Sequence, residues 1–117
     1  MIDTDKLDNA ILKHLHLVNG RQDASTIWWL SRLQDQIGEL PDYAEVVSAM
    51  KRLQADGVVR LRKYINEHGG LYEYSGSESD LDDHQFFGFA SFEVMVTDQG
   101  RRLWNVPSSQ IGFQRPN

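Results

Sequence analysis

The sequence predicts a small α+β domain, with three amino-terminal helices, a long β-hairpin and a short closing helix. Apolar residues recur every three or four positions as far as about residue 55, which is the spacing of amphipathic helices. From Val58 onward the spacing drops toward two, which is typical of strands. Gly20, Gly38 and Gly57 separate the segments, and 117 residues are enough for one hydrophobic core.

Three helices are expected before residue 57. The first is capped by Asp3 or Thr4 and ends before Gly20, and the second is capped by Asp23 or Ser25 and runs to about residue 37. The third spans residues 42–55, directly after Pro41, whose missing amide is tolerated at a helix start.

Helical wheels predict which side of each helix is packed. The second helix is expected to pack through Leu30, Leu33 and Ile37, with Ile27 and Trp29 flanking them. The packed face of the third helix is expected to consist of Val46, Ala49, Met50 and Leu53.

A β-hairpin is expected after the third helix. Its first strand begins at Val58, and residues 71–74 can pair back after a turn. An acidic loop over residues 75–83 then leads, through an aromatic stretch, to a returning strand at residues 92–96. The aromatic side chains are expected to pair across the strands, with stacking on single-stranded bases as the alternative.

Side-chain alternation along the first strand predicts which of its basic side chains point toward solvent. Leu61 is expected to point inward, which leaves Arg60 and Arg62 for solvent. Lys63 shares the parity of Leu61, so it is expected past the edge of the core or with its ammonium group in water.

A short helix from Asp98 to about Trp104, capped by Thr97, is expected to close the domain. The predicted domain therefore covers residues 1–105, and residues 106–117 are expected to form an irregular tail.

Two stretches carry a resemblance to a known family. Residues 46–61 read VVSAMKRLQADGVVRL, a third helix that leads through Gly57 into a strand, and residues 96–104 read VTDQGRRLW, a strand followed by a helix. In this order, after two amphipathic helices, the chain resembles the winged helix-turn-helix superfamily of bacterial and phage regulators. The resemblance implies that the third helix enters the major groove of duplex DNA, and that the hairpin, the wing, touches the backbone or the minor groove.

The function implied by the resemblance is a DNA-binding regulator of transcription, acting as a monomer or a homodimer. Ser48 would reach a base edge, and the neighbouring basic residues would hold phosphates. Carried over by position, the implied DNA-binding residues are Ser48, Lys51, Arg52, Arg60, Arg62 and Lys63.

The charge of the chain argues in part against a DNA partner. The net charge is −5, whereas much of the affinity of nucleic-acid binders comes from phosphate neutralisation. Only residues 42–72 lean positive, with five basic residues against four acidic ones, and residues 73–83 hold five acids and no base. The alternative is a non-catalytic adaptor that binds protein, through the acidic loop or through Trp28.

Trp28 and Trp29 point about 100° apart on a helix, so they are not expected to enter the same core. Trp29 is expected to be buried. Trp28 is expected to pack beneath the closing helix or the tail, or else to anchor a protein partner or a second copy of the chain.

Other classes of function find no support in the sequence. The chain has no cysteine, so disulfides and thiolate chemistry are excluded, and its four histidines lack the spacing of a metal site. No nucleotide-binding loop or nucleophile motif is present, so neither an enzyme nor a cofactor is expected. The chain lacks an apolar run of about 18 residues and a signal-like start, and it is therefore expected in the cytoplasm, away from membranes.

Overall fold

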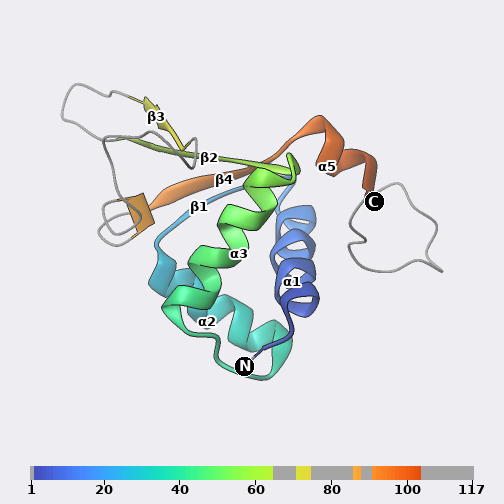
Figure 1. Cartoon of the computed structure of the whole chain (residues 1–117), viewed down its shortest axis with the longest axis vertical. Helices are drawn as coiled ribbons and strands as arrows, with labels where there is room; N and C mark the ends of the chain where they lie inside the picture. Colours follow the sequence, from blue (N-terminus) through green and yellow to red (C-terminus); the bar gives the residue numbers. More distant parts are fainter. Residues whose placement is uncertain (1, 65–70, 75–85, 88–90, 104–117) are drawn as a thin grey trace.

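The computed structural model describes residues 2–64, 71–74, 86–87 and 91–103 (Figure 1). It confirms the α+β class and the three amino-terminal helices. In chain order the elements are α1 (Thr4–Leu17), β1 (Arg21–Ala24), α2 (Thr26–Ile37), α3 (Tyr43–Ala55), β2 (Val59–Tyr64), β3 (Leu71–Glu73), β4 (Phe92–Val96) and α5 (Asp98–Leu103).

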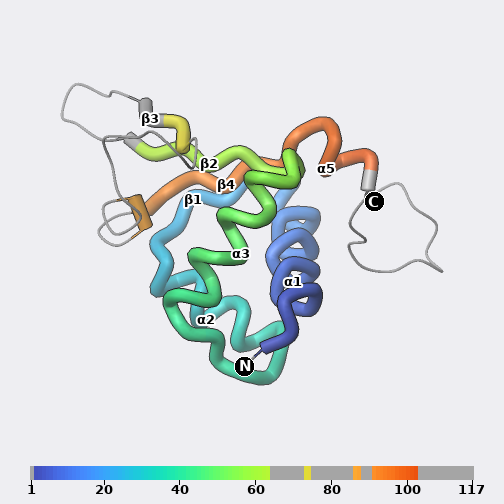
Figure 2. The backbone as a smooth tube through the Cα atoms, in the orientation of Figure 1, coloured from blue at the N-terminus to red at the C-terminus, as the bar shows by residue number. Residues whose placement is uncertain are grey.

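The strands form one antiparallel sheet in the order β1-β4-β2-β3, and α1, α2 and α3 pack together beneath it (Figures 1 and 2). The hairpin β2–β3 pairs Arg62 with Glu73, as a wing does. Strand β4 then returns between β1 and β2, where Leu61 lies opposite Val94. The arrangement is winged-helix-like.

Local sequence signals set the helix starts. Asp3 caps α1 by accepting from two backbone amides, and Ser25 caps α2 by accepting from the Trp28 amide. Asp42 and Glu45 form a capping box at the start of α3, with the Asp42 carboxylate accepting from the Glu45 amide at 2.7 Å. These three caps place the helix starts within a residue or two of the sequence prediction.

The core lies where the three helices meet the inner face of the sheet. The predicted packed face of α3 is confirmed, because Val46, Ala49, Met50 and Leu53 are fully buried. Trp29 of α2 is fully buried as well.

The prediction for Ile27 is wrong. The helical wheel predicts that it flanks the core, but the residue is 76% exposed. It lies in the first turn of α2, one turn before the half-buried Leu30 and on a different side of the helix from Leu33. The packed side of α2 is therefore narrower than its apolar residues suggest.

Strand β1 was not predicted from the sequence. Its four residues, Arg-Gln-Asp-Ala, have neither β-branched side chains nor apolar alternation. They form a strand because the turn at Asn19 and Gly20, both with positive φ, aims the chain along β4. Tertiary pairing therefore overrides weak local preference.

Four of the aromatic residues in and after the wing are part of the core rather than a stacking platform. Tyr74, Phe86, Phe87 and Phe92 are buried, with ring centroids 4.9 to 5.7 Å apart. The Thr26 hydroxyl donates to the Phe87 carbonyl at 2.6 Å, which anchors this cluster to α2. Phe89 and the acidic loop at residues 75–83 lie outside the described residues.

Helix α5 closes the domain as predicted. Thr97 donates from its hydroxyl to the Gly57 carbonyl at 2.6 Å and accepts from the Gly100 amide, which joins α5 to the corner between α3 and β2. Trp104 and the predicted tail lie outside the described residues. Within the described ranges, no helix has the length and apolar character needed to cross a bilayer.

Candidate interaction surfaces

The exposed strip of α3 is narrow and mostly uncharged. Ala44, Ser48 and Ala55 are exposed, and Lys51 beside them is half-buried. Glu45, at the start of the helix, accepts from the Ile2 amide at 3.0 Å in addition to its role in the capping box. Ser48 therefore lies on the exposed side of α3, as the resemblance implies, between Glu45 and Lys51.

Arg52 does not face outward as expected. Its Nη2 donates to Asp8 Oδ1 of α1 at 2.9 Å, and its Nε lies 3.4 Å from Asp8 Oδ2. The Asp8 side chain is 0% exposed and that of Arg52 is 30% exposed. The correction has a physical reason: a buried carboxylate needs a cationic partner, and Arg52 supplies it from the neighbouring helix.

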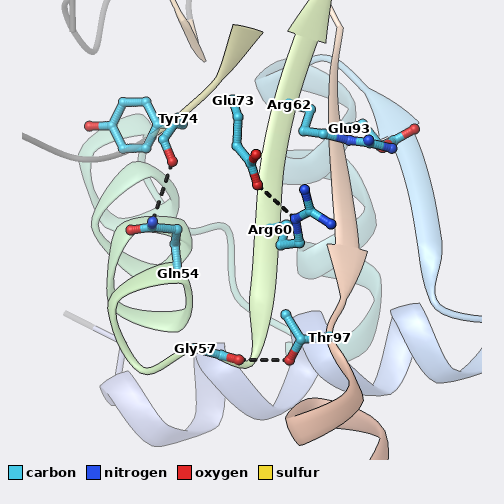
Figure 3. A network of polar contacts seen from close by, with 8 residues as sticks. All are labelled: Gln54, Gly57, Arg60, Arg62, Glu73, Tyr74, Glu93 and Thr97. Carbon is cyan, nitrogen blue, oxygen red and sulfur yellow. Dashed lines mark hydrogen bonds and ion pairs between the residues drawn. The ribbon is translucent and has the colours of Figure 1, made fainter. Parts of the chain in front are cut away.

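On the wing, Arg60 pairs with Glu73 across β2 and β3. The Arg60 Nε donates to Glu73 Oε1 at 2.7 Å, as Figure 3 shows. The hydrogen bond from Arg60 lowers the pKa of Glu73, and the same bond raises the pKa of Arg60. Both side chains are about half exposed, so the pair lies at the surface and is already neutralised.

Arg62, also on the outer face of the sheet, shares one carboxylate with Arg21. The Arg62 Nε donates to Glu93 Oε1 at 2.8 Å, and the Arg21 Nε lies 2.5 Å from Glu93 Oε2. The strand register explains the arrangement. Glu93 lies opposite Arg62 of β2 on one side and opposite Asp23 of β1 on the other, and Arg21 is two residues before Asp23, on the same face of the sheet. Two arginines thus flank one nearly buried carboxylate, and Figure 3 shows the Arg62 side of this contact.

The prediction for the Lys63 side chain is also wrong. Its ammonium group is not in water: the side chain is buried, and Nζ donates to the Phe86 carbonyl at 2.9 Å. The ammonium also lies 5.9 Å from the centroid of the Phe86 ring. Burial lowers the pKa of Lys63.

Most of the basic residues implied as phosphate ligands are thus held by groups of the protein itself. Arg52, Arg60 and Arg62 each pair with a carboxylate, and Lys63 binds a carbonyl oxygen. The outer face of the sheet alternates in sign, since three carboxylates, Asp23, Glu73 and Glu93, accompany its arginines. Within the described residues, the structure does not bring the implied ligands together as an uncompensated basic patch.

A different surface, on α2, carries two exposed apolar side chains. We define the α2 outer face as Ile27, Trp28, Ser31, Arg32 and Asp35, which are all exposed and follow one side of the helix. Ile27 is 76% exposed and Trp28 is 38% exposed. Trp28 contacts His14 of α1 and Trp29. The tail, one of the two packing partners expected for Trp28, lies outside the described residues.

His14 of α1 holds Trp28 in place. The His14 ring is buried and makes edge contacts with Trp28 and Trp29, each at a centroid distance of 5.2 Å. Its Nε2 lies 2.9 Å from the Gln22 Oε1, and its Nδ1 accepts from the Arg32 Nε at 3.4 Å. Trp28 and Arg32 are therefore fixed from behind, which lowers the entropy that a partner would have to remove.

Arg32 and Asp35 were not singled out from the sequence, and Ile27 was placed at the edge of the core. A helical wheel of α2 contains the signal, because all three residues lie away from the direction of Leu33. The described residues contain no group of three or more metal-binding side chains.

No family model, curated protein or solved structure matches the chain.

Proposed function

We propose that the chain is a member of the winged helix-turn-helix superfamily that works as a non-catalytic protein-binding module, with the α2 outer face as its contact surface. The observation that carries the proposal is the exposure of Ile27 and Trp28 next to each other on a helix that is packed from behind. Exposed aromatic and aliphatic side chains of this kind are the anchors around which protein interfaces form.

The pairing of the basic residues supports the same proposal. A duplex would have to displace Glu73 from Arg60, and to bind Arg52 it would have to take that guanidinium from the buried Asp8. The net charge of −5 adds repulsion from phosphate. A protein partner meets neither penalty at the α2 outer face.

Site-specific photo-crosslinking tests the proposal. A photoreactive amino acid in place of Ile27, in the full chain in its own cells, should give adducts with protein. The matched control carries the same amino acid in place of Ser48, which is exposed on α3, and should give few. Absence of protein adducts from position 27, or equal yields from both positions, would contradict the proposal.

Duplex DNA is the second candidate, and the exposed strip of α3 favours it. Ser48 is accessible, and Lys51 lies one turn further along in a winged-helix-like arrangement. This candidate predicts that Lys51→Glu weakens binding to duplex DNA and flattens its salt dependence. A titration followed by fluorescence anisotropy measures both quantities, and unchanged binding would remove Lys51 from the interface.

A further inference from the structure

We infer that the partner of the α2 outer face is a second copy of the same chain, in a two-fold dimer whose α2 helices run antiparallel. This inference deepens the proposed function and rests on it. The charges on the face, more than its apolar residues, point to this partner.

Arg32 and Asp35 are opposite charges one turn apart on the α2 outer face. Both are exposed, and within the described residues neither forms an ion pair. The Arg32 Nε is directed at the Nδ1 of His14 at 3.4 Å, which leaves the two terminal nitrogens of the guanidinium for a carboxylate outside the chain. The face therefore offers one oriented donor group and one acceptor group.

A two-fold axis perpendicular to α2 matches these charges to each other. If the helices cross between Arg32 and Asp35, Arg32 of each copy lies opposite Asp35 of the other, and both ion pairs form at once. Parallel helices would instead set arginine against arginine and aspartate against aspartate. The charges thus select the antiparallel arrangement.

The same crossing point brings the exposed apolar residues together. Ile27 and Trp28 precede it by about as many residues as Leu40 follows it. In an antiparallel pair they therefore face the segment that carries Leu40 of the other copy, and Leu40 is 60% exposed. Ser31, near the middle of the face, is small enough to let the two helix backbones approach. In this arrangement both the apolar ends and the charged centre of the α2 outer face meet matching groups of the second copy.

Sedimentation equilibrium of the full chain tests the inference through charge reversal. Wild type should be a dimer. In Arg32→Asp alone and in Asp35→Arg alone, both contacts become repulsive, so each variant should dimerise roughly 100-fold more weakly, about tenfold for each contact. Arg102→Asp, a reversal at an exposed position of α5, is the matched control and should leave the dimer intact.

Mixing the two single variants gives the sharpest result. In the mixed dimer each of the two contacts again joins one aspartate to one arginine, so the mixture should dimerise as tightly as wild type. A monomeric wild type, or a mixture that stays monomeric while both variants are folded by circular dichroism, overturns the inference. If wild type is monomeric and position 27 still crosslinks to another protein, the proposed function stands and only the second copy is wrong.

Discussion

Asp8 of α1 and Arg52 of α3 show what a single contact does in this fold. They are 44 positions apart in the chain, yet the buried carboxylate of one helix is completed by a guanidinium from the other. This contact ties the two helices together and removes Arg52 from the surface set that the resemblance implies.

Arg52→Gln should lower the free energy of unfolding by about 3 kcal/mol, since it removes a guanidinium that pairs with the buried Asp8 carboxylate, and partial exposure of Arg52 limits the loss. Urea denaturation measures it. Adding Asp8→Asn should recover part of the loss because the buried charge that Arg52 had paired with is then gone. Lys13→Gln, at an exposed position of α1, should change stability by less than about 0.5 kcal/mol. If Arg52→Gln and Lys13→Gln lowered the free energy of unfolding by similar amounts, the ion pair between Arg52 and Asp8 would not be the cause.

Lys63 predicts a pH dependence of stability. Its pKa in the folded chain is below the ordinary value of 10.5, so the unfolded chain binds more protons in the range between the two values. Stability contributed by this residue therefore rises with pH across that range, and below it the cost of burying the charge is complete. Wild type should gain stability relative to Lys63→Met as the pH is raised from neutral toward 10.5.

The matched control for that comparison is Lys13→Met, which removes an exposed amine of the same kind. Its stability should follow that of wild type in parallel at every pH. Thermal or urea unfolding at a series of pH values provides the data. A constant difference between wild type and Lys63→Met over the whole series would show that Lys63 is not the group responsible.

At the scale of elements, the helices and strands whose ends depend on local patterns could be predicted from the sequence. The ends of α1, α2 and α3 follow from caps and glycines, and the bounds of β4 follow from a short apolar run. Strand β1 could not be predicted, because its pairing with β4 is decided by contacts more than 60 residues away in sequence. The same limit applies to the site. The helical pattern of α2 allows an exposed Trp28 to be predicted as one alternative. The partners of Arg52 and Arg62 lie on other elements, so no local pattern predicts them.

Gly100 decides whether α5 can dock. A Cβ atom at this position would lie 2.5 Å from the Val58 carbonyl oxygen and 2.8 Å from the Val96 Cγ1. Because one of these neighbours is backbone, Gly100→Ala should cost about 2–3 kcal/mol of unfolding free energy. Gly38→Ala is the comparison, since its Cβ meets nothing within 4 Å and only the positive φ of 86° is strained, which costs about 1 kcal/mol.

Differential scanning calorimetry ranks the two glycine variants. Gly100→Ala is expected to have the lower melting temperature of the two, with α5 detached from the corner between α3 and β2. Equal melting temperatures would show that α5 shifts to accept the methyl group.

At the scale of the whole molecule, the fold keeps a winged-helix-like arrangement, whereas its electrostatics differ from those expected of a DNA-binding protein. The arginines of β1 and β2 are matched by carboxylates of β3 and β4, and Arg52 is matched by α1. What the described surface offers instead is the α2 outer face, where Ile27 and Trp28 are exposed.

Titration of a random-sequence duplex at low and at raised salt, followed by fluorescence anisotropy, tests this account most directly. Because Arg52, Arg60 and Arg62 are paired with carboxylates of the protein itself, the chain should bind weakly at low salt, and the affinity should change little with salt. Tight binding that falls steeply as salt is raised would contradict the account, since it would mean that phosphates can take Arg52, Arg60 and Arg62 from their carboxylates.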